Sequence, residues 1–155
     1  MIARASLISI AACLALGAWS VGASAADAYP NGCVSCHVVT KDKGDQRIST
    51  LLKAWTAGKV SPDLLAKTKA SMPSGVAAKG KHPSAADSLE DIPALCLDCH
   101  TPDSRKAPPF ARLMHMVHLT GAKNGFVTQY KGDCMTCHKL NQQTGEWSTP
   151  SGAEK

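Results

Sequence analysis

The sequence CVSCH at residues 33–37 returns as CLDCH at 96–100 and as CMTCH at 134–138. Each copy places two cysteines three positions apart and a histidine directly after the second cysteine. Histidine is about one residue in 25 of this chain, so three such placements by chance have a probability on the order of 10⁻⁴. This repeated pattern, rather than any long apolar run, decides how the chain folds.

The pattern Cys-x-x-Cys-His is the attachment signature of a c-type haem. Two thiols one turn apart add to the two vinyl groups of the macrocycle, and the histidine that follows binds the iron. Three copies predict three covalently attached haem c groups. The attachment cysteines are Cys33, Cys36, Cys96, Cys99, Cys134 and Cys137, and the iron-binding histidines of the motifs are His37, His100 and His138.

Disulfide bridges and zinc sites are the alternative uses of paired cysteines. Neither of them requires a histidine directly after the second cysteine of every pair. Six thiols and six histidines also exceed the ligands that two tetrahedral zinc sites need. The motifs therefore favour haem attachment.

The first 25 residues have the features of a cleaved secretory signal. Arg4 precedes an apolar run over 5–21, and the small residues at 23–25 form a cleavage site. Two alternatives stay open: the segment is retained as a membrane anchor, or a lipoprotein-type box ending at Cys13 carries a lipid. Cleavage after Ala25 removes Cys13, so the three motifs use every remaining cysteine.

Residues 26–155 are expected to form a single domain in the periplasm, because bacteria attach haem c after export. The printed net charge of +5 omits the haem carboxylates. Without Arg4, sixteen basic side chains exceed twelve acidic ones by four, and six ionised carboxylates from three haems bring the total to about −2. The basic residues are scattered and match no nucleic-acid-binding motif, so we expect no nucleic-acid partner.

Two helices are predicted between the first and second motifs. Apolar residues at helical spacing over 48–55 predict a helix that ends near Gly58. Ser61 as N-cap and Pro62 as the first helical residue begin a second helix, which stops before Pro73. We expect these two helices to form a helical hairpin, with Trp55 packed in the core.

Later in the chain, Pro109 begins a predicted helix over 110–119, and a short stretch over 126–130 leads into the third motif. Residues 73–84 have the composition of a loop. No alternating strand pattern of any length occurs. The expected fold class is mainly α with extensive loops and no significant sheet, organised around three haems. With two Phe, two Tyr and three Trp, the chain has few large apolar side chains, so we expect it to be largely unfolded without haem.

Three histidines, His82, His115 and His118, lie outside the motifs and match the three sixth positions of three haem irons. His115 and His118 are three residues apart on the predicted helix, so their side chains point about 60° apart and each can reach a different haem. Methionine is the rival sixth ligand, but enough histidines are present to fill every position. Which of the three serves which haem stays open from the sequence.

Together these residues resemble the small periplasmic multihaem cytochromes c of class III, which carry bis-histidine haems. In that family a His-x-x-His pair commonly supplies ligands to two different haems, and residues 115–118 are similar to that device. The resemblance covers mainly residues 82–138. Unlike compact triheme members, this chain places the pair after two motifs and adds a helical segment at 45–72.

The resemblance implies a periplasmic electron carrier, or the cytochrome subunit of a respiratory complex, and not an enzyme. Its implied partners are redox proteins, such as a membrane quinol-oxidising cytochrome or a terminal reductase. The alternative is a haem-containing reductase, or its subunit, with one iron open to substrate. A sensor module has no signalling segment to support it. The oligomeric state stays open.

Overall fold

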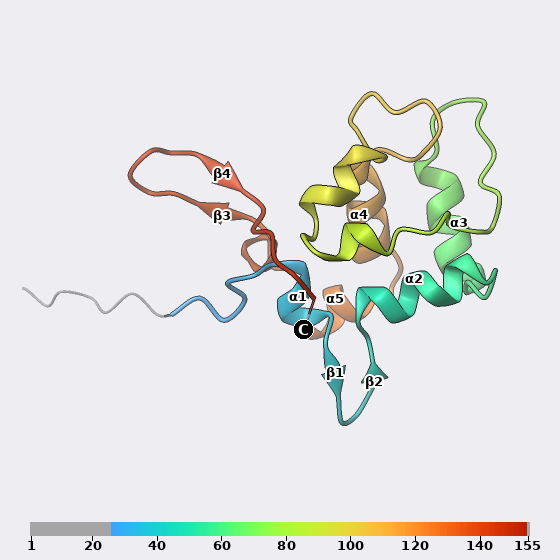
Figure 1. Cartoon of the computed structure of the whole chain (residues 1–155). Helices are drawn as coiled ribbons and strands as arrows, with labels where there is room; N and C mark the ends of the chain where they lie inside the picture. The colour runs from blue at the N-terminus through green and yellow to red at the C-terminus, as the bar shows by residue number, and fades with distance from the viewer. Residues whose placement is uncertain (1–25, 155) are drawn as a thin grey trace, which may run out of the picture.

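The computed structural model describes residues 26–154, and Figure 1 shows the arrangement of its elements. The predicted signal segment and its two alternatives lie outside the described residues. None of the helices within residues 26–154 is long and apolar enough to cross a membrane. The elements in chain order are α1 (Cys33–Cys36), β1 (Val39–Thr40), β2 (Gly44–Asp45), α2 (Ile48–Thr56), α3 (Pro62–Ser71), η1 (Asp87–Leu89), η2 (Ala94–Asp98), α4 (Phe110–Leu119), α5 (Gly125–Gln129), η3 (Cys134–Thr136), β3 (Lys139–Leu140) and β4 (Trp147–Ser148).

The three longest helices lie where the sequence predicts them. α2 ends at Thr56, and Gly58 beyond it has a φ of 75°, a conformation that glycine adopts readily. α3 begins as expected, because the Ser61 hydroxyl accepts a hydrogen bond from the Leu64 N–H at 3.2 Å. α4 covers 110–119 as predicted, with Pro109 as its N-cap residue.

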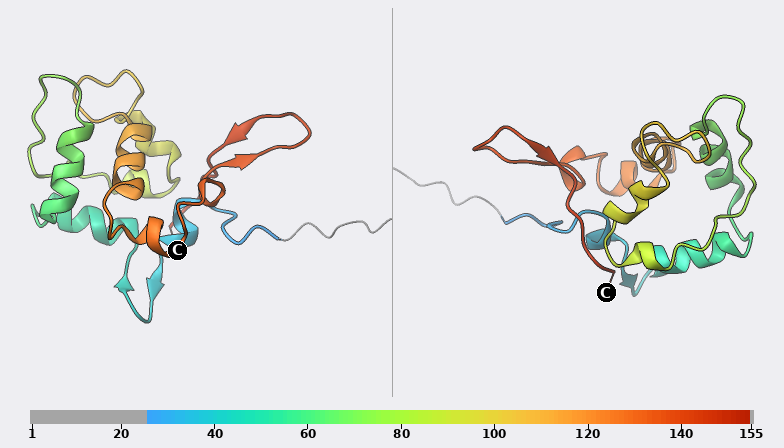
Figure 2. Two further views of the ribbon diagram at one scale, coloured as in Figure 1. Left: turned by 180° about the vertical axis from the view of Figure 1, so that it is seen from behind. Right: turned by 45° about the horizontal axis from the view of Figure 1, so that its top comes forward.

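The predicted hairpin of α2 and α3 is wrong, because α3 packs against α4 instead. Figures 1 and 2 show α3 and α4 side by side, while α2 runs across their ends. The buried side of α3 carries Thr68 and Ser71, whose hydroxyls donate to carbonyls one turn earlier. α3 therefore supports the helix that carries two of the predicted haem ligands, His115 and His118.

Two antiparallel strand pairs occur that the sequence pattern does not predict. β1 pairs with β2, and β3 pairs with β4, with two residues in each strand. Strands this short contain no alternation to detect. Both pairs project from the rest of the chain in Figure 1, and both directly follow a haem motif.

The C-terminal segment connects the first two motifs. Gly152 and Ile92 exchange backbone hydrogen bonds of 2.8 and 2.9 Å just before the second motif. The Gly152 backbone also lies against the Val34 side chain of the first motif. At the end of the chain, the Glu154 carboxylate accepts from the Ser49 N–H at 3.0 Å. The first and second motifs are thus held together by residues distant in sequence.

The described residues contain very little conventional core. Only Ile92 and Leu113, at 1% and 5% exposure, are buried among the large apolar side chains of residues 26–154. A domain of this size normally buries far more apolar surface to offset its conformational entropy. A core this sparse is of the kind that a large apolar cofactor would complete.

Candidate functional site

The structure places each motif histidine beside one of the three other histidines. His37 lies against His118 with ring centroids 6.2 Å apart, and His100 lies against His82 at 6.0 Å. His138 lies against His115 at 6.1 Å. Each of the six histidines belongs to one pair only. The structure therefore gives each motif histidine a single partner, which the sequence leaves open.

These spacings can be compared with what one iron between two imidazoles requires. With a metal–nitrogen bond of about 2 Å and about 1.1 Å from that nitrogen to the ring centre, two imidazoles on opposite sides of one iron have centroids about 6.2 Å apart. All three observed values lie within about 0.2 Å of this requirement. The histidine pairs therefore fit a bis-imidazole iron.

Backbone carbonyls orient four of these rings. The Nδ1 atoms of His37 and His100 bond to the carbonyls of Gln46 and Pro108, at 2.8 and 2.7 Å. A carbonyl oxygen only accepts, so Nδ1 carries the proton and Nε2 keeps a free lone pair for a metal.

The same arrangement occurs at two of the histidines outside the motifs. Nδ1 of His82 donates to the Pro83 carbonyl at 2.7 Å, and Nδ1 of His118 donates to the Met114 carbonyl at 2.9 Å. Such partners fix the tautomer and the orientation of a ligand and raise its basicity. In the first and second pairs, both imidazole rings are thus oriented by a backbone carbonyl that bonds to Nδ1, which leaves Nε2 free to bind a metal.

A cavity of about 660 Å³ opens between the first pair of histidines. His37 and His118 both line it, together with Cys36 of the first motif. Phe126 of α5 packs edge-on against the His118 ring at 5.9 Å. The volume lies within the range of cofactor pockets, and its lining offers two imidazoles, an attachment thiol and an aromatic wall.

The second pair is supported from two helices. Phe110 at the start of α4 packs against the His100 ring at 6.5 Å, and its N–H donates to the His100 carbonyl at 3.0 Å. Trp55 at the end of α2 lies 5.5 Å from the His82 ring, and its carbonyl accepts from the His82 N–H at 3.4 Å. Trp55 is only partly buried, so it belongs to the surroundings of His82 rather than to a separate core.

Helix α4 carries ligands of two different pairs. His118 faces the first motif and His115 faces the third, as their spacing on the helix predicts. Side chains three positions apart on a helix have Cβ atoms about 5–6 Å apart. The first and third sites are therefore close neighbours.

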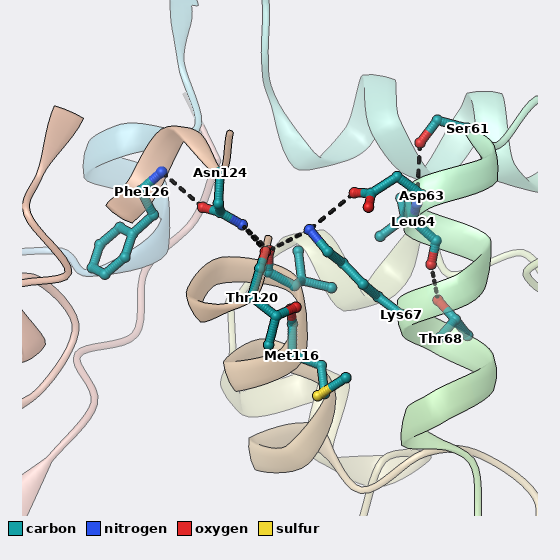
Figure 3. A network of polar contacts seen from close by, with 10 residues as sticks. Ser61, Asp63, Leu64, Lys67, Thr68, Met116, Thr120, Asn124 and Phe126 are labelled. Carbon is teal, nitrogen blue, oxygen red and sulfur yellow. Dashed lines mark hydrogen bonds and ion pairs between the residues drawn. The ribbon is translucent and has the colours of Figure 1, made fainter. Parts of the chain in front are cut away.

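A network of polar contacts fixes the last turn of α4, as Figure 3 shows. The Lys67 ammonium of α3 bonds to the Asp63 carboxylate at 2.9 Å and to the Val117 carbonyl at 3.4 Å. The Asn124 side chain donates to the same carbonyl at 2.6 Å and accepts from the Phe126 N–H at 2.9 Å. The network places His118 and Phe126 at the first site.

The electrostatics of His118 reflect this position. Burial is the main cause that lowers the pKa of His118, opposed by its hydrogen bond to the Met114 carbonyl. The neighbouring Lys67, His37 and His115 side chains lower it further. The imidazole is therefore held neutral, which is the form that binds a metal.

All six cysteines within residues 26–154 are free thiols in the structure. Burial raises the pKa of Cys33 to about 11, and the nearby Cys137 and Cys96 thiols add to the shift. Burial also raises the pKa values of Cys36, Cys96 and Cys137. Neutral thiols are poor zinc ligands and poor nucleophiles. The influence of Cys137 and Cys96 on this pKa indicates that one thiol from each of the other two motifs lies in the surroundings of Cys33.

Several residues around the histidines were not singled out from the sequence. Phe110 and Phe126 each pack against a ligand ring, and Lys67 lines the cavity of the first pair. The two phenylalanines are the only ones in the chain, which is a signal the sequence does contain. No sequence pattern marks Lys67, because its position follows from the packing of α3 on α4.

No group of three or more His, Cys, Asp and Glu side chains that could hold a metal ion occurs within residues 26–154. An axially ligated haem requires only two such protein ligands, which is what each pair supplies. The chain matches no protein-family model, no curated protein and no solved structure.

Proposed function

We propose that the chain carries three covalent haem c groups, each between two histidines, and transfers electrons between redox partners. The observation that supports this most directly is the pairing of all six histidines at 6.0–6.2 Å, with one motif histidine in every pair. Chance packing would have no reason to match every motif histidine with a different partner. The three attachment motifs then supply one covalent anchor for each pair.

Haem iron ligated by two imidazoles accepts or releases one electron and stays six-coordinate and low-spin. The residues of the chain restrict it to that role. His37 and His118 would hold the haem iron of the first site from both sides, and the histidine pairs of the other two sites would do the same. A substrate has no free coordination position, so we propose an electron carrier rather than a reductase with an open iron.

The first motif lies between the other two. Asp27, ahead of the first motif, pairs with Lys139 after the third at 2.8 Å, and Tyr29 packs on Tyr130 at 5.8 Å. On the other side, the C-terminal segment joins the first motif to Ile92 ahead of the second. We infer that electrons pass between the second and third sites by way of the first.

The proposed setting follows from the function. We propose that the chain works in the periplasm, with redox proteins such as a membrane quinol-oxidising cytochrome or a terminal reductase as partners. The lysines on its surface would steer such partners, because complementary charge raises association rates more than affinity.

The test is production of the full chain in a host that attaches haem c. We expect a mature protein with the mass of residues 26–155 plus three haems, fully low-spin when oxidised. It should take up three electrons and give them back reversibly, and its reduced form should not bind carbon monoxide. Fewer than three haems would refute the attachment proposal. A stoichiometric high-spin iron would refute the closed carrier and favour the reductase.

A further inference from the structure

Among the lysines that line the cavity of the first site within residues 26–154, Lys67 is the one that is largely withdrawn from solvent. Its side chain is 13% exposed, and it lines the cavity that His37 and His118 also line. Lys43 and Lys123 line the same cavity but are exposed residues. Water screens the charges of exposed side chains strongly, whereas a withdrawn charge acts through a less polar medium.

The ammonium of Lys67 is held in place by two acceptors on different helices. Asp63, one turn earlier on α3, accepts at 2.9 Å, and the Val117 carbonyl in the last turn of α4 accepts at 3.4 Å. Figure 3 shows the Lys67 ammonium pointing toward the Asp63 carboxylate. Its position relative to the His118 helix is therefore fixed rather than averaged over many rotamers.

The carboxylate of the pair is in a different environment from the ammonium. Asp63 lines the same cavity, but its side chain is 75% exposed, so solvent weakens its field more than that of Lys67, which is 13% exposed. The pair therefore does not cancel at the cavity, and a net positive field is left there.

We propose that Lys67 sets the reduction potential of the haem at the first site, raising it above the value that the two imidazoles alone would give. This inference rests on the proposed function. Reduction adds one electron to the ferric iron and lowers the charge of the site by one. A fixed positive charge nearby stabilises the reduced state relative to the oxidised state, and thus raises the potential. Asp63 acts in the opposite direction and more weakly.

The direction of the change in reduction potential distinguishes this electrostatic role of Lys67 from a structural one. Lys67→Met removes the positive charge and should lower the potential of the first haem. A unit charge about 10 Å away at an effective dielectric constant of about 20 changes the ratio of reduced to oxidised haem at a fixed applied potential on the order of tenfold. Asp63→Asn breaks the same ion pair but removes a negative charge, so it should raise the potential, by less.

The matched controls come from the same helix. Lys67→Arg keeps the charge and should retain the wild-type potential, and Lys67→Gln provides a second neutral variant if the methionine variant loses haem. Lys69→Met removes an exposed lysine of α3 that does not line the cavity and should leave the potential unchanged.

The measurement is a redox titration of the full haem-loaded protein, followed by electron paramagnetic resonance. The signal of the first haem is identified as the one that His118→Ala removes from the low-spin set. Opposite shifts in Lys67→Met and Asp63→Asn support the proposal. Equal shifts in one direction, or no shift in both neutral Lys67 variants, overturn it. If the wild-type protein lacks three low-spin haems, the proposed function itself has failed, which is a distinguishable result.

Discussion

The ring of His82 lies nearly parallel to that of His100, at an angle of 13°, whereas His37 and His118 are nearly perpendicular at 87°. The third pair is intermediate at 49°. Imidazole planes donate electron density into the iron orbitals perpendicular to them. Perpendicular planes leave two iron orbitals almost equal in energy, and parallel planes split them, so the three proposed haems would differ electronically.

The first prediction concerns these angles. Frozen oxidised protein should give three distinct low-spin signals in electron paramagnetic resonance. The signal of the perpendicular first site should have the largest maximum g value, and that of the parallel second site should be the most rhombic. Three identical signals would contradict the ring geometry even if all haems were low-spin.

The second prediction assigns each distal ligand. His82→Ala should open the second haem alone, and His115→Ala should open the third alone, because each loses one axial ligand. Each variant should bind one carbon monoxide per protein when reduced, and added imidazole should restore a low-spin spectrum. A variant that stays fully low-spin would show that its histidine is not a ligand.

The third prediction concerns the sparse core. Ile92→Ala should lower the free energy of unfolding of the haem-loaded protein by about 2–4 kcal/mol, because Ile92 is 1% exposed and its removal leaves a cavity. Val39→Ala, at a side chain 61% exposed, is the control and should change it by less than about 0.5 kcal/mol. Thermal melts followed by far-ultraviolet circular dichroism measure both. Equal effects would contradict the assigned core.

The fourth prediction concerns acid stability. Hydrogen bonds from the Arg47 side chain are the main cause that lowers the pKa of Asp45 well below its ordinary value of 3.8, and the Arg47 N–H and Thr50 hydroxyl contribute. A carboxyl with a depressed folded pKa stabilises the fold above its unfolded value, and this contribution is lost as the pH falls below about 4. Asp45→Asn should therefore lower the melting temperature at pH 7 more than at pH 3.

The control for acid stability is Asp42→Asn in the same turn, which removes an equal charge. It should shift the melting temperature little at either pH. Because the Gln46 carbonyl that orients His37 follows Asp45 directly, loosening this turn should also broaden the spectrum of the first haem. An unchanged difference between pH 7 and pH 3 in Asp45→Asn would disprove the linkage.

Most of the candidate site could be predicted from the sequence, because a covalent motif and a count of histidines depend on composition and spacing alone. The i, i+3 spacing of His115 and His118 also predicted two different partners, and the pairing has that form. The fifth and sixth ligands could thus be named without a fold.

The pairing itself could not be predicted, because it depends on where packing places each ligand. His82 lies in a loop, and its contact with Trp55 and its hydrogen bond to the Pro83 carbonyl place it beside His100. His118 reaches His37 because α4 packs on α3, and this contact takes the place of the expected α2–α3 hairpin. Local periodicity carries no information on which helix a given helix will meet.

The histidine pairing also implies an order in which the three sites receive their second ligand. His118 follows His37 by about 80 residues, whereas His115 precedes the third motif. If the proposed haems are attached as the chain leaves the cytoplasm from its N-terminus, the first haem would be attached before its second ligand has been exported. This haem would pass through a five-coordinate, reactive state until α4 folds against it and His118 supplies the sixth ligand. The third haem, by contrast, meets a distal ligand that is already outside.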